Sequence, residues 1–110
     1  MDTTYNKTLA SDVTEDLPGI SRFRAHVGEM FDVLVPKGPW RLELVEVKPL
    51  AAQAGASDED AFSLVFKAEI DCTISQGSVA LEHEKIGWTV LYLVSIGEDE
   101  QAQYYEAIFN

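Results

Sequence analysis

The chain has 110 residues and a formal net charge of −11, because 19 aspartate and glutamate residues outnumber 8 lysine and arginine residues. This length predicts one domain, and a composition of 46% hydrophobic and 25% charged residues is typical of an ordinary globular protein. The negative charge repels nucleic acids and anionic lipid headgroups, so we expect no nucleic-acid partner. No apolar run reaches about 18 residues, so we also expect no insertion into a membrane.

Residues 1–16 are polar and have no sustained apolar period, which predicts an N-terminal arm outside a single β domain of residues 17–110. The arm has no basic region followed by an apolar stretch, so it does not resemble a secretory signal. The expected compartment is therefore the cytoplasm, with signal-free export to a surface or tail-like structure left open. Cys72 is the only cysteine, which excludes an intrachain disulfide and predicts a small buried side chain.

The first predicted element after Pro18-Gly19 is a short helix of one or two turns. Ser21 is expected to cap it, Phe23 and Val27 lie four residues apart, and Gly28 is expected to end it. Segments with the alternation of β-strands follow, separated by turn residues such as the PKGP stretch at 36–39. These segments are residues 29–35, 40–50, 62–71, 78–85, 88–96 and 103–110.

Two of these strands have special features. WTVLYLVSI, residues 88–96, is apolar on both sides, and such a strand is usually central in its sheet or sandwiched between layers. QYYEAIFN, residues 103–110, predicts a closing strand that places Phe109 in the core. The complete pattern predicts an all-β fold, largely an antiparallel meander. Its expected form is a small antiparallel six-stranded barrel or compact sandwich with one short N-terminal helix.

The order of these elements resembles a family of small uncharacterised bacterial proteins. That family has an "F…hvG..F.V" opening, an "LeLveV" strand, an "FSLlF" strand, a "qG.y.LeH...G...LflvPiG" hairpin and a terminal "YeAvFN". The matching positions lie between about residues 20 and 110: Phe23, His26 to Gly28, Phe31, Val33, Leu42 to Val47, Phe62 to Phe66, Gln76-Gly77, Leu81 to His83, Gly87, Leu91 to Gly97 and Tyr105 to Asn110. Ser95 departs from the pattern, which commonly has proline there. The family has no agreed activity, so the resemblance implies no catalytic residue, and it implies an accessory role beside tail-collar-like proteins.

Residues that usually carry chemistry are few and not grouped in the sequence. A zinc site needs three or four ligands, and His26 and His83 lack the spacing of a metal motif, even with Glu82 or Glu84 added. We interpret His83 as a hydrogen-bonded turn residue. The chain has no G-x-S-x-G motif and no glycine loop that would hold a phosphate, and Asp58-Glu59-Asp60 lacks the spaced ligands of a calcium loop. We therefore predict no enzymatic activity, no metal and no cofactor.

Two kinds of binding function stay open. The first is protein–protein association, because the arm has strand-compatible residues that could cover a sheet edge of its own or another molecule. Tyr5, Thr8, Leu9 and Val13 are the side chains expected to insert into a groove of the partner. Docking on a neighbour would give a homo-oligomer or a filament. The alternative is a small-ligand or glycan-binding module, in which two aromatic residues opposite the Phe31 face form a stacking surface. The candidates are Trp40, Trp88, Tyr92, Tyr104 and Tyr105.

Overall fold

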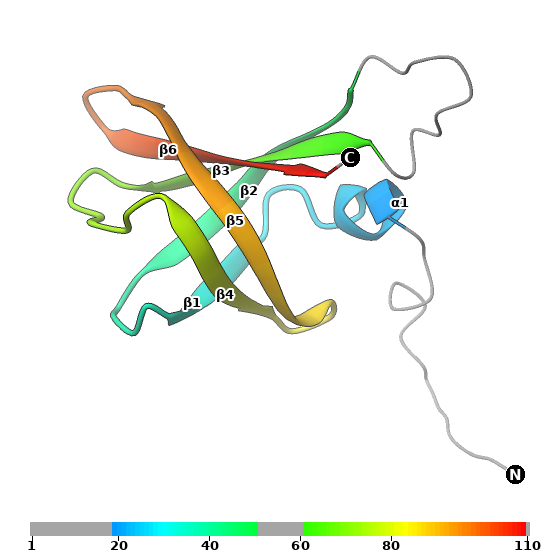
Figure 1. The fold of residues 1–110 in the computed structure, drawn as a ribbon, viewed down its shortest axis with the longest axis horizontal. Coiled ribbons are helices and arrows are strands. Elements are labelled where there is room, and N and C mark those ends of the chain that lie inside the picture. Colours follow the sequence, from blue (N-terminus) through cyan, green and yellow to red (C-terminus); the bar gives the residue numbers. More distant parts are fainter. Residues whose placement is uncertain (1–18, 51–60, 110) are drawn as a thin grey trace, which may run out of the picture.

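The computed structural model describes residues 19–50 and 61–109, which form one helix and six strands (Figure 1). The predicted arm, with Tyr5, Thr8, Leu9 and Val13, lies outside the described residues. The helix is α1 (Gly19–Arg24), and the strands are β1 (Met30–Val35), β2 (Arg41–Pro49), β3 (Phe62–Glu69), β4 (Gly77–His83), β5 (Gly87–Glu98) and β6 (Ala102–Phe109). Within the described ranges, no helix is long and apolar enough to cross a membrane.

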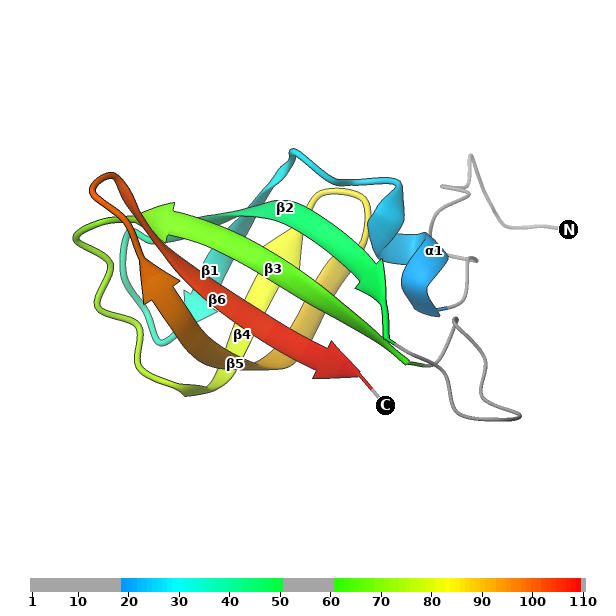
Figure 2. The ribbon, with the colours of Figure 1, turned by 90° about the horizontal axis from the view of Figure 1, so that it is seen from above.

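The strands form a closed barrel in the order β1-β2-β3-β6-β5-β4, and β4 returns to pair with β1. Each neighbouring pair is antiparallel. Figure 2 shows β3 and β6 running side by side across β4 and β5. The all-β prediction is confirmed, and of the two forms left open by the sequence the structure has the barrel.

The predicted meander is correct within each half of the barrel. Strands β1, β2 and β3 pair in sequence order, and so do β4, β5 and β6. The halves then join through β3 with β6 along the whole of both strands, and through β1 with β4. Because β3 pairs with β6 and not with β4, the closing strand β6 has β3 on one side and β5 on the other, so the predicted closing strand is paired within the sheet.

The core fills the barrel with side chains from alternate positions of all six strands. Phe31 and Phe66 meet edge to face with ring centroids 5.5 Å apart, a favourable arrangement for aromatic pairs. The largest fully buried side chains are Tyr105, Phe31, Phe62, Phe66, Ile20, Leu42, Leu44, Leu64, Leu81 and Leu93. Cys72 is also buried, as predicted.

Helix α1 lies at one end of the barrel (Figures 1 and 2). Its buried residues are Ile20 and Phe23, and the Phe23 ring lies 6.1 Å from Phe62 and 5.8 Å from Phe109 between centroids. The helix begins at Gly19, two residues before the predicted cap Ser21, so that prediction is wrong. The chain leaves the helix after Arg24 and turns through Gly28, whose φ of +94° suits glycine.

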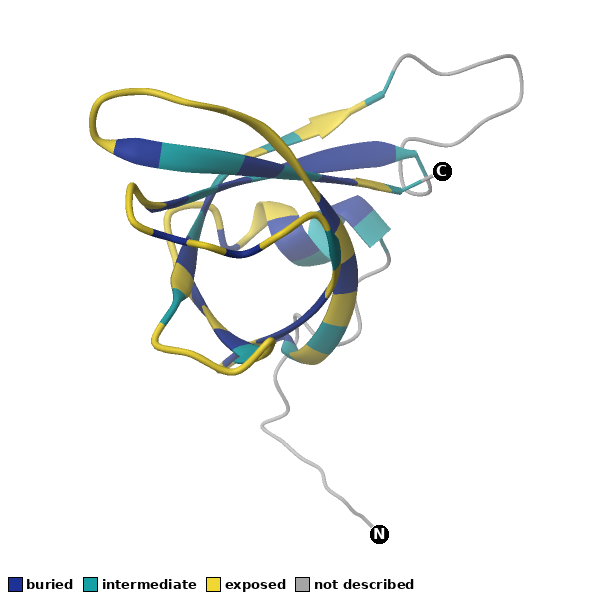
Figure 3. Cartoon of the chain, turned by 60° about the vertical axis from the view of Figure 1, so that its left-hand side comes forward, coloured by how far each residue is buried: buried dark blue, intermediate teal, exposed yellow. Residues whose placement is uncertain are grey.

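The outer face of β5 differs from the sequence interpretation. The strand has a paired neighbour on each side, but no layer among the described residues covers its outer face, so it is not sandwiched. Leu91 and Leu93 point into the core, while the alternate side chains are exposed. Figure 3 shows this alternation of buried and exposed bands along the strands. We call the exposed set the β5 stripe; it consists of Trp88, Val90, Tyr92, Val94 and Ile96.

Candidate functional site

The β5 stripe is the first candidate site. Its side chains are 64% exposed at Trp88, 51% at Val90 and 57% at Tyr92, although strand alternation normally places polar residues on a solvated face. Trp88 and Tyr92 lie four residues apart on one strand, so their Cα atoms are separated by about 13 Å at a rise of about 3.3 Å per residue. The strand therefore presents two large aromatic side chains, with a valine between them, to the solvent.

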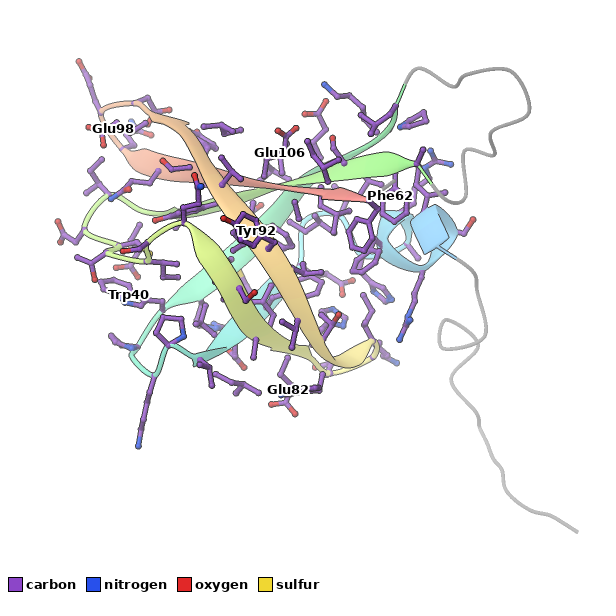
Figure 4. All side chains as sticks on the ribbon, viewed as in Figure 1. Trp40, Phe62, Glu82, Tyr92, Glu98 and Glu106 are labelled. Carbon is purple, nitrogen blue, oxygen red and sulfur yellow. The ribbon has the colours of Figure 1, made fainter. Side chains whose placement is uncertain are left out.

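Strand register shows what borders the stripe. Glu82 of β4 stands beside Trp88, and Ser78 stands beside Tyr92. On the other side Glu106 of β6 stands beside Val94. Figure 4 shows Tyr92 on β5 with Glu106 above it and Glu82 below it. The stripe is therefore apolar along its length and has a carboxylate on each flank.

The second candidate site is a cluster of two imidazoles and a carboxylate. His26 comes from the turn after α1, Glu29 directly precedes β1, and His83 ends β4. Glu29 Oε1 lies 2.9 Å from His26 Nδ1 and 2.7 Å from His83 Nε2. Both histidines are buried, whereas the Glu29 side chain is half exposed. The fold thus joins two residues that lie far apart in the sequence through one carboxylate oxygen.

The hydrogen bonds of His83 fix its tautomer. Its Nδ1 accepts hydrogen bonds from the backbone N–H groups of Lys85 (3.0 Å) and Ile86 (3.2 Å). A nitrogen that accepts cannot carry a proton, so the ring proton is on Nε2 and is donated to Glu29. The interpretation of His83 as a hydrogen-bonded turn residue is confirmed, because its side chain holds the β4–β5 turn.

His26 and Glu29 complete the cluster. A carboxylate only accepts hydrogen bonds, so His26 donates from Nδ1, and its buried Nε2 has no hydrogen-bond partner among the described residues. The pKa of Glu29 is lowered from its ordinary value, chiefly because His83 donates to the carboxylate and further because His26 does. Partial burial opposes this shift. The two histidines therefore stabilise the ionised form of the Glu29 carboxylate.

The three residues offer a possible metal site, since their nitrogen and oxygen ligand atoms all lie within 4.8 Å of one another. A histidine that binds a metal through one nitrogen normally donates a proton from the other to an acceptor. His83 has the opposite arrangement, because two backbone N–H groups point at its Nδ1. Metal binding at Nε2 would require loss of both bonds or a second deprotonation of the ring. The geometry fits a hydrogen-bonded cluster better than a metal centre, and the absence of a metal stays a prediction.

The cluster opens into a cleft of about 570 Å³ that is lined by residues of β1, β2 and β4 and of the turns beside them. Asp32 and Arg41 form an ion pair on its wall, with Nε and Oδ1 2.8 Å apart. Within the described part of the chain, no hydroxyl or thiol bonds to either imidazole. The arrangement needed for an activated nucleophile is therefore not formed there. The lining residues are His26, Glu29, Met30, Asp32, Arg41, Glu82, His83, Glu84 and Lys85.

Replacing Glu29 with glutamine is expected to reduce stability by less than about 1 kcal/mol at pH 7, since the carboxylate is half exposed. Because its pKa is lower in the folded protein, ionised Glu29 stabilises the fold above its ordinary pKa near 4.5, and this contribution is lost as the pH falls through the lowered value. The difference in unfolding free energy between wild type and Glu29→Gln should therefore shrink from pH 5 to pH 3. Urea unfolding at each pH measures it; a constant difference would contradict the assignment.

The aromatic candidates from the sequence separate into two groups. Tyr105 is buried and its hydroxyl donates to the backbone oxygen of Ile74 at 3.0 Å, and Trp40 packs half-buried against the core. Tyr104 is half-buried and donates to Asp99 Oδ2 at 3.0 Å, which raises the pKa of Tyr104. Trp88 and Tyr92 are the two that face outward. The possible stacking surface is thus reduced to the β5 stripe.

Sequence reasoning missed Glu29 as the partner of both histidines. It considered Glu82 and Glu84 because they flank His83 in the chain, but the cluster uses a carboxylate 54 positions away. His26 and Glu29 are three residues apart, which was the one local signal. Closure of the barrel through β1 and β4 is what brings His83 to them.

Closure of the barrel also bears on the sheet edge that the arm was predicted to cover. Covering a sheet edge presumes an open sheet, and a closed barrel removes such edges. Each described strand has a neighbour on both sides along at least part of its length. The roles of Tyr5, Thr8, Leu9 and Val13 stay predictions.

The protein is thus a small closed six-stranded β-barrel. It has an exposed apolar stripe on β5 and a histidine–carboxylate cluster that opens into a neighbouring cleft. The chain belongs to the family of the domain of unknown function DUF6916, whose model matches residues 18–109. This agrees with the resemblance to an uncharacterised family over about residues 20–110. Comparison with curated proteins and with solved structures returns no match.

Proposed function

We propose that this protein is a non-enzymatic assembly module that acts by protein–protein association, with the β5 stripe as its contact surface. The observation that supports it is the row of five large apolar side chains exposed on one strand, which pairs with β4 over Gly87–Leu93 and with β6 over Val94–Glu98. Contiguous exposed apolar surface on a small domain marks an interaction site. Tryptophan and tyrosine are the residues most often responsible for binding energy in interfaces.

The free energy of apolar burial favours a stripe that a partner covers. Each large apolar side chain contributes about 1.5–3 kcal/mol when it is fully removed from water. The exposed fractions of Trp88, Val90 and Tyr92 all exceed one half, so most of this free energy is still available to a partner. A chain that exposed these residues without a partner would have a persistent tendency to aggregate, which its charge of −11 counteracts.

Sedimentation velocity at low and high salt tests the proposal. At low ionic strength the charge keeps copies of the chain apart, and at about 0.5 M salt the screening length falls to a few ångströms. We expect weak concentration-dependent association of the wild type at high salt. The triple variant Trp88→Thr, Val90→Thr, Tyr92→Thr should not associate, because threonine keeps the strand preference but removes the apolar surface.

Two further chains make the result specific. The control variant Val27→Thr, Ile70→Thr, Ile108→Thr removes three exposed apolar side chains outside β5 and should behave as the wild type.

A chain without residues 1–16 should also associate if the stripe is the contact surface. Association lost only with the arm would instead favour self-assembly through Tyr5, Thr8, Leu9 and Val13. If the stripe variant associates like the wild type, the stripe is not the contact surface.

A glycan-binding function is the second candidate, because Trp88 and Tyr92 are the outward aromatic pair on a curved sheet. Aromatic faces stack on the apolar faces of sugars. Titration with sugars should then give a saturable change in tryptophan fluorescence that Trp88→Thr abolishes. An assembly module that binds protein alone should show no saturable change.

A further inference from the structure

The apolar surface extends beyond β5 in one direction. Ala80 of β4 pairs with Val90 on one side and with Val35 of β1 on the other. Val35 is 59% and Val90 51% exposed, and the small side chain of Ala80 between them is buried. The apolar surface of the β5 stripe therefore continues past the buried Ala80 to Val35 of β1.

Carboxylates border the β5 stripe on both sides. Residues 77–109 contain six acidic residues and one basic residue, Lys85, whereas residues 19–50 contain four acidic and five basic residues. Glu82 and Glu106, which flank the stripe, belong to none of the ion pairs between described residues. The acidic residues are Glu82, Glu84, Glu98, Asp99, Glu100 and Glu106.

The cleft continues the acidic border at one end. Glu82 stands beside Trp88 in the register and also lines the cleft next to the histidine cluster. Four carboxylates line that cleft, from Glu29, Asp32, Glu82 and Glu84. Two of them already accept hydrogen bonds from protein groups, Glu29 from the histidines and Asp32 from Arg41. A cationic side chain that entered beside Trp88 would meet Glu82 and Glu84.

The geometry points to a partner of definite chemistry: the β5 stripe docks a segment of another protein that presents apolar side chains bordered by lysine or arginine. This rests on the proposed function. A second copy of the chain fits the surface poorly, because it would bring the carboxylates of two stripes together, and like charges face to face oppose association. A basic border would pair with Glu82 and Glu106, and a lysine or arginine would enter the cleft.

Fluorescence anisotropy with labelled model peptides tests this on the full chain. The probe is a 14-residue amphipathic peptide of leucine and lysine; one control peptide has glutamate for lysine, and another has serine for leucine. We expect saturable binding of the leucine–lysine peptide at 50 mM salt and at least tenfold weaker binding of both controls. The stripe variant Trp88→Thr, Val90→Thr, Tyr92→Thr should weaken binding at least tenfold.

A matched pair of charge variants separates local pairing from net charge. Glu82→Gln with Glu106→Gln should weaken binding threefold to tenfold and reduce its salt dependence. Glu46→Gln with Glu69→Gln removes the same charge from exposed positions of β2 and β3 and should change binding less than twofold. Equal weakening by both pairs, or equal binding of the leucine–glutamate peptide, would overturn the inference.

Sedimentation under the same conditions distinguishes failure of this inference from failure of the proposed function. If the wild type forms a stripe-dependent dimer at 50 mM salt and binds no peptide, the partner is a second copy; the association function then stands and the inference about a basic partner is wrong. If the wild type neither binds the peptide nor associates through the stripe at any salt concentration, both are wrong.

Discussion

Replacing His83 with alanine is expected to lower the free energy of unfolding by about 3 kcal/mol. The ring is buried and lies 4.7 Å from Phe31 between centroids, so its removal leaves a cavity in the core. It also leaves the N–H groups of Lys85 and Ile86 without their acceptor, and an unsatisfied buried donor costs about 1–3 kcal/mol. Urea unfolding monitored by circular dichroism measures the change.

Two conservative variants of His83 separate its two nitrogen atoms. Asparagine places an oxygen close to the position of Nδ1, so His83→Asn should keep the turn bonds and recover about half of the loss. Glutamine imitates Nε2 instead, so His83→Gln should keep only a contact with Glu29 and be nearly as unstable as alanine. If glutamine were the better replacement, the bond to Glu29 at 2.7 Å would be the more important one, and the argument from the turn would be wrong.

The strands could be predicted from local patterns, because successive side chains of a strand point to opposite faces and every second residue is therefore buried. Phe31 with Val33, and Leu42 with Leu44, alternate with polar or exposed neighbours, and these buried positions are the ones that line the barrel. Closure could not be predicted, since it depends on the pairing of β1 with β4 and of β3 with β6. These pairs join residues that are distant in the chain, and alternation is identical in a barrel and in a sandwich.

The β5 stripe could not be predicted for a related reason. Residues 88–96 are apolar on both sides, and a fully covered strand and a strand with an exposed binding face have the same sequence pattern. Only the position of the strand in a single-layer barrel shows that Trp88 and Tyr92 have no cover among the described residues. The contact between Glu29 and His83 could not be predicted for the same reason. It depends on closure of the barrel, and the sequence around Glu29 does not indicate which distant histidine closure brings close.

Three phenylalanine rings pack together at the end of the barrel where α1 lies. Phe62 begins β3 and Phe109 ends β6, so they pair at the same end of the two strands, and their nearly parallel rings stack with centroids 4.4 Å apart. Helix α1 supplies the third ring, Phe23. The helix has only six residues, too few to be stable alone, so its position depends on this aromatic contact and on Ile20.

Phe23→Ala is accordingly expected to lower the free energy of unfolding by about 3–5 kcal/mol, the range for a buried phenylalanine replaced by alanine. Val27→Ala is the matched control: the sequence places Val27 on the same helical face, but the structure ends α1 at Arg24 and leaves Val27 46% exposed. The control should cost less than about 0.5 kcal/mol. Thermal and urea unfolding of both variants give the comparison. Similar losses at the two positions would mean that the helix continues to Val27 as the sequence predicted, whereas a small loss at Phe23 would mean that α1 is not part of the core.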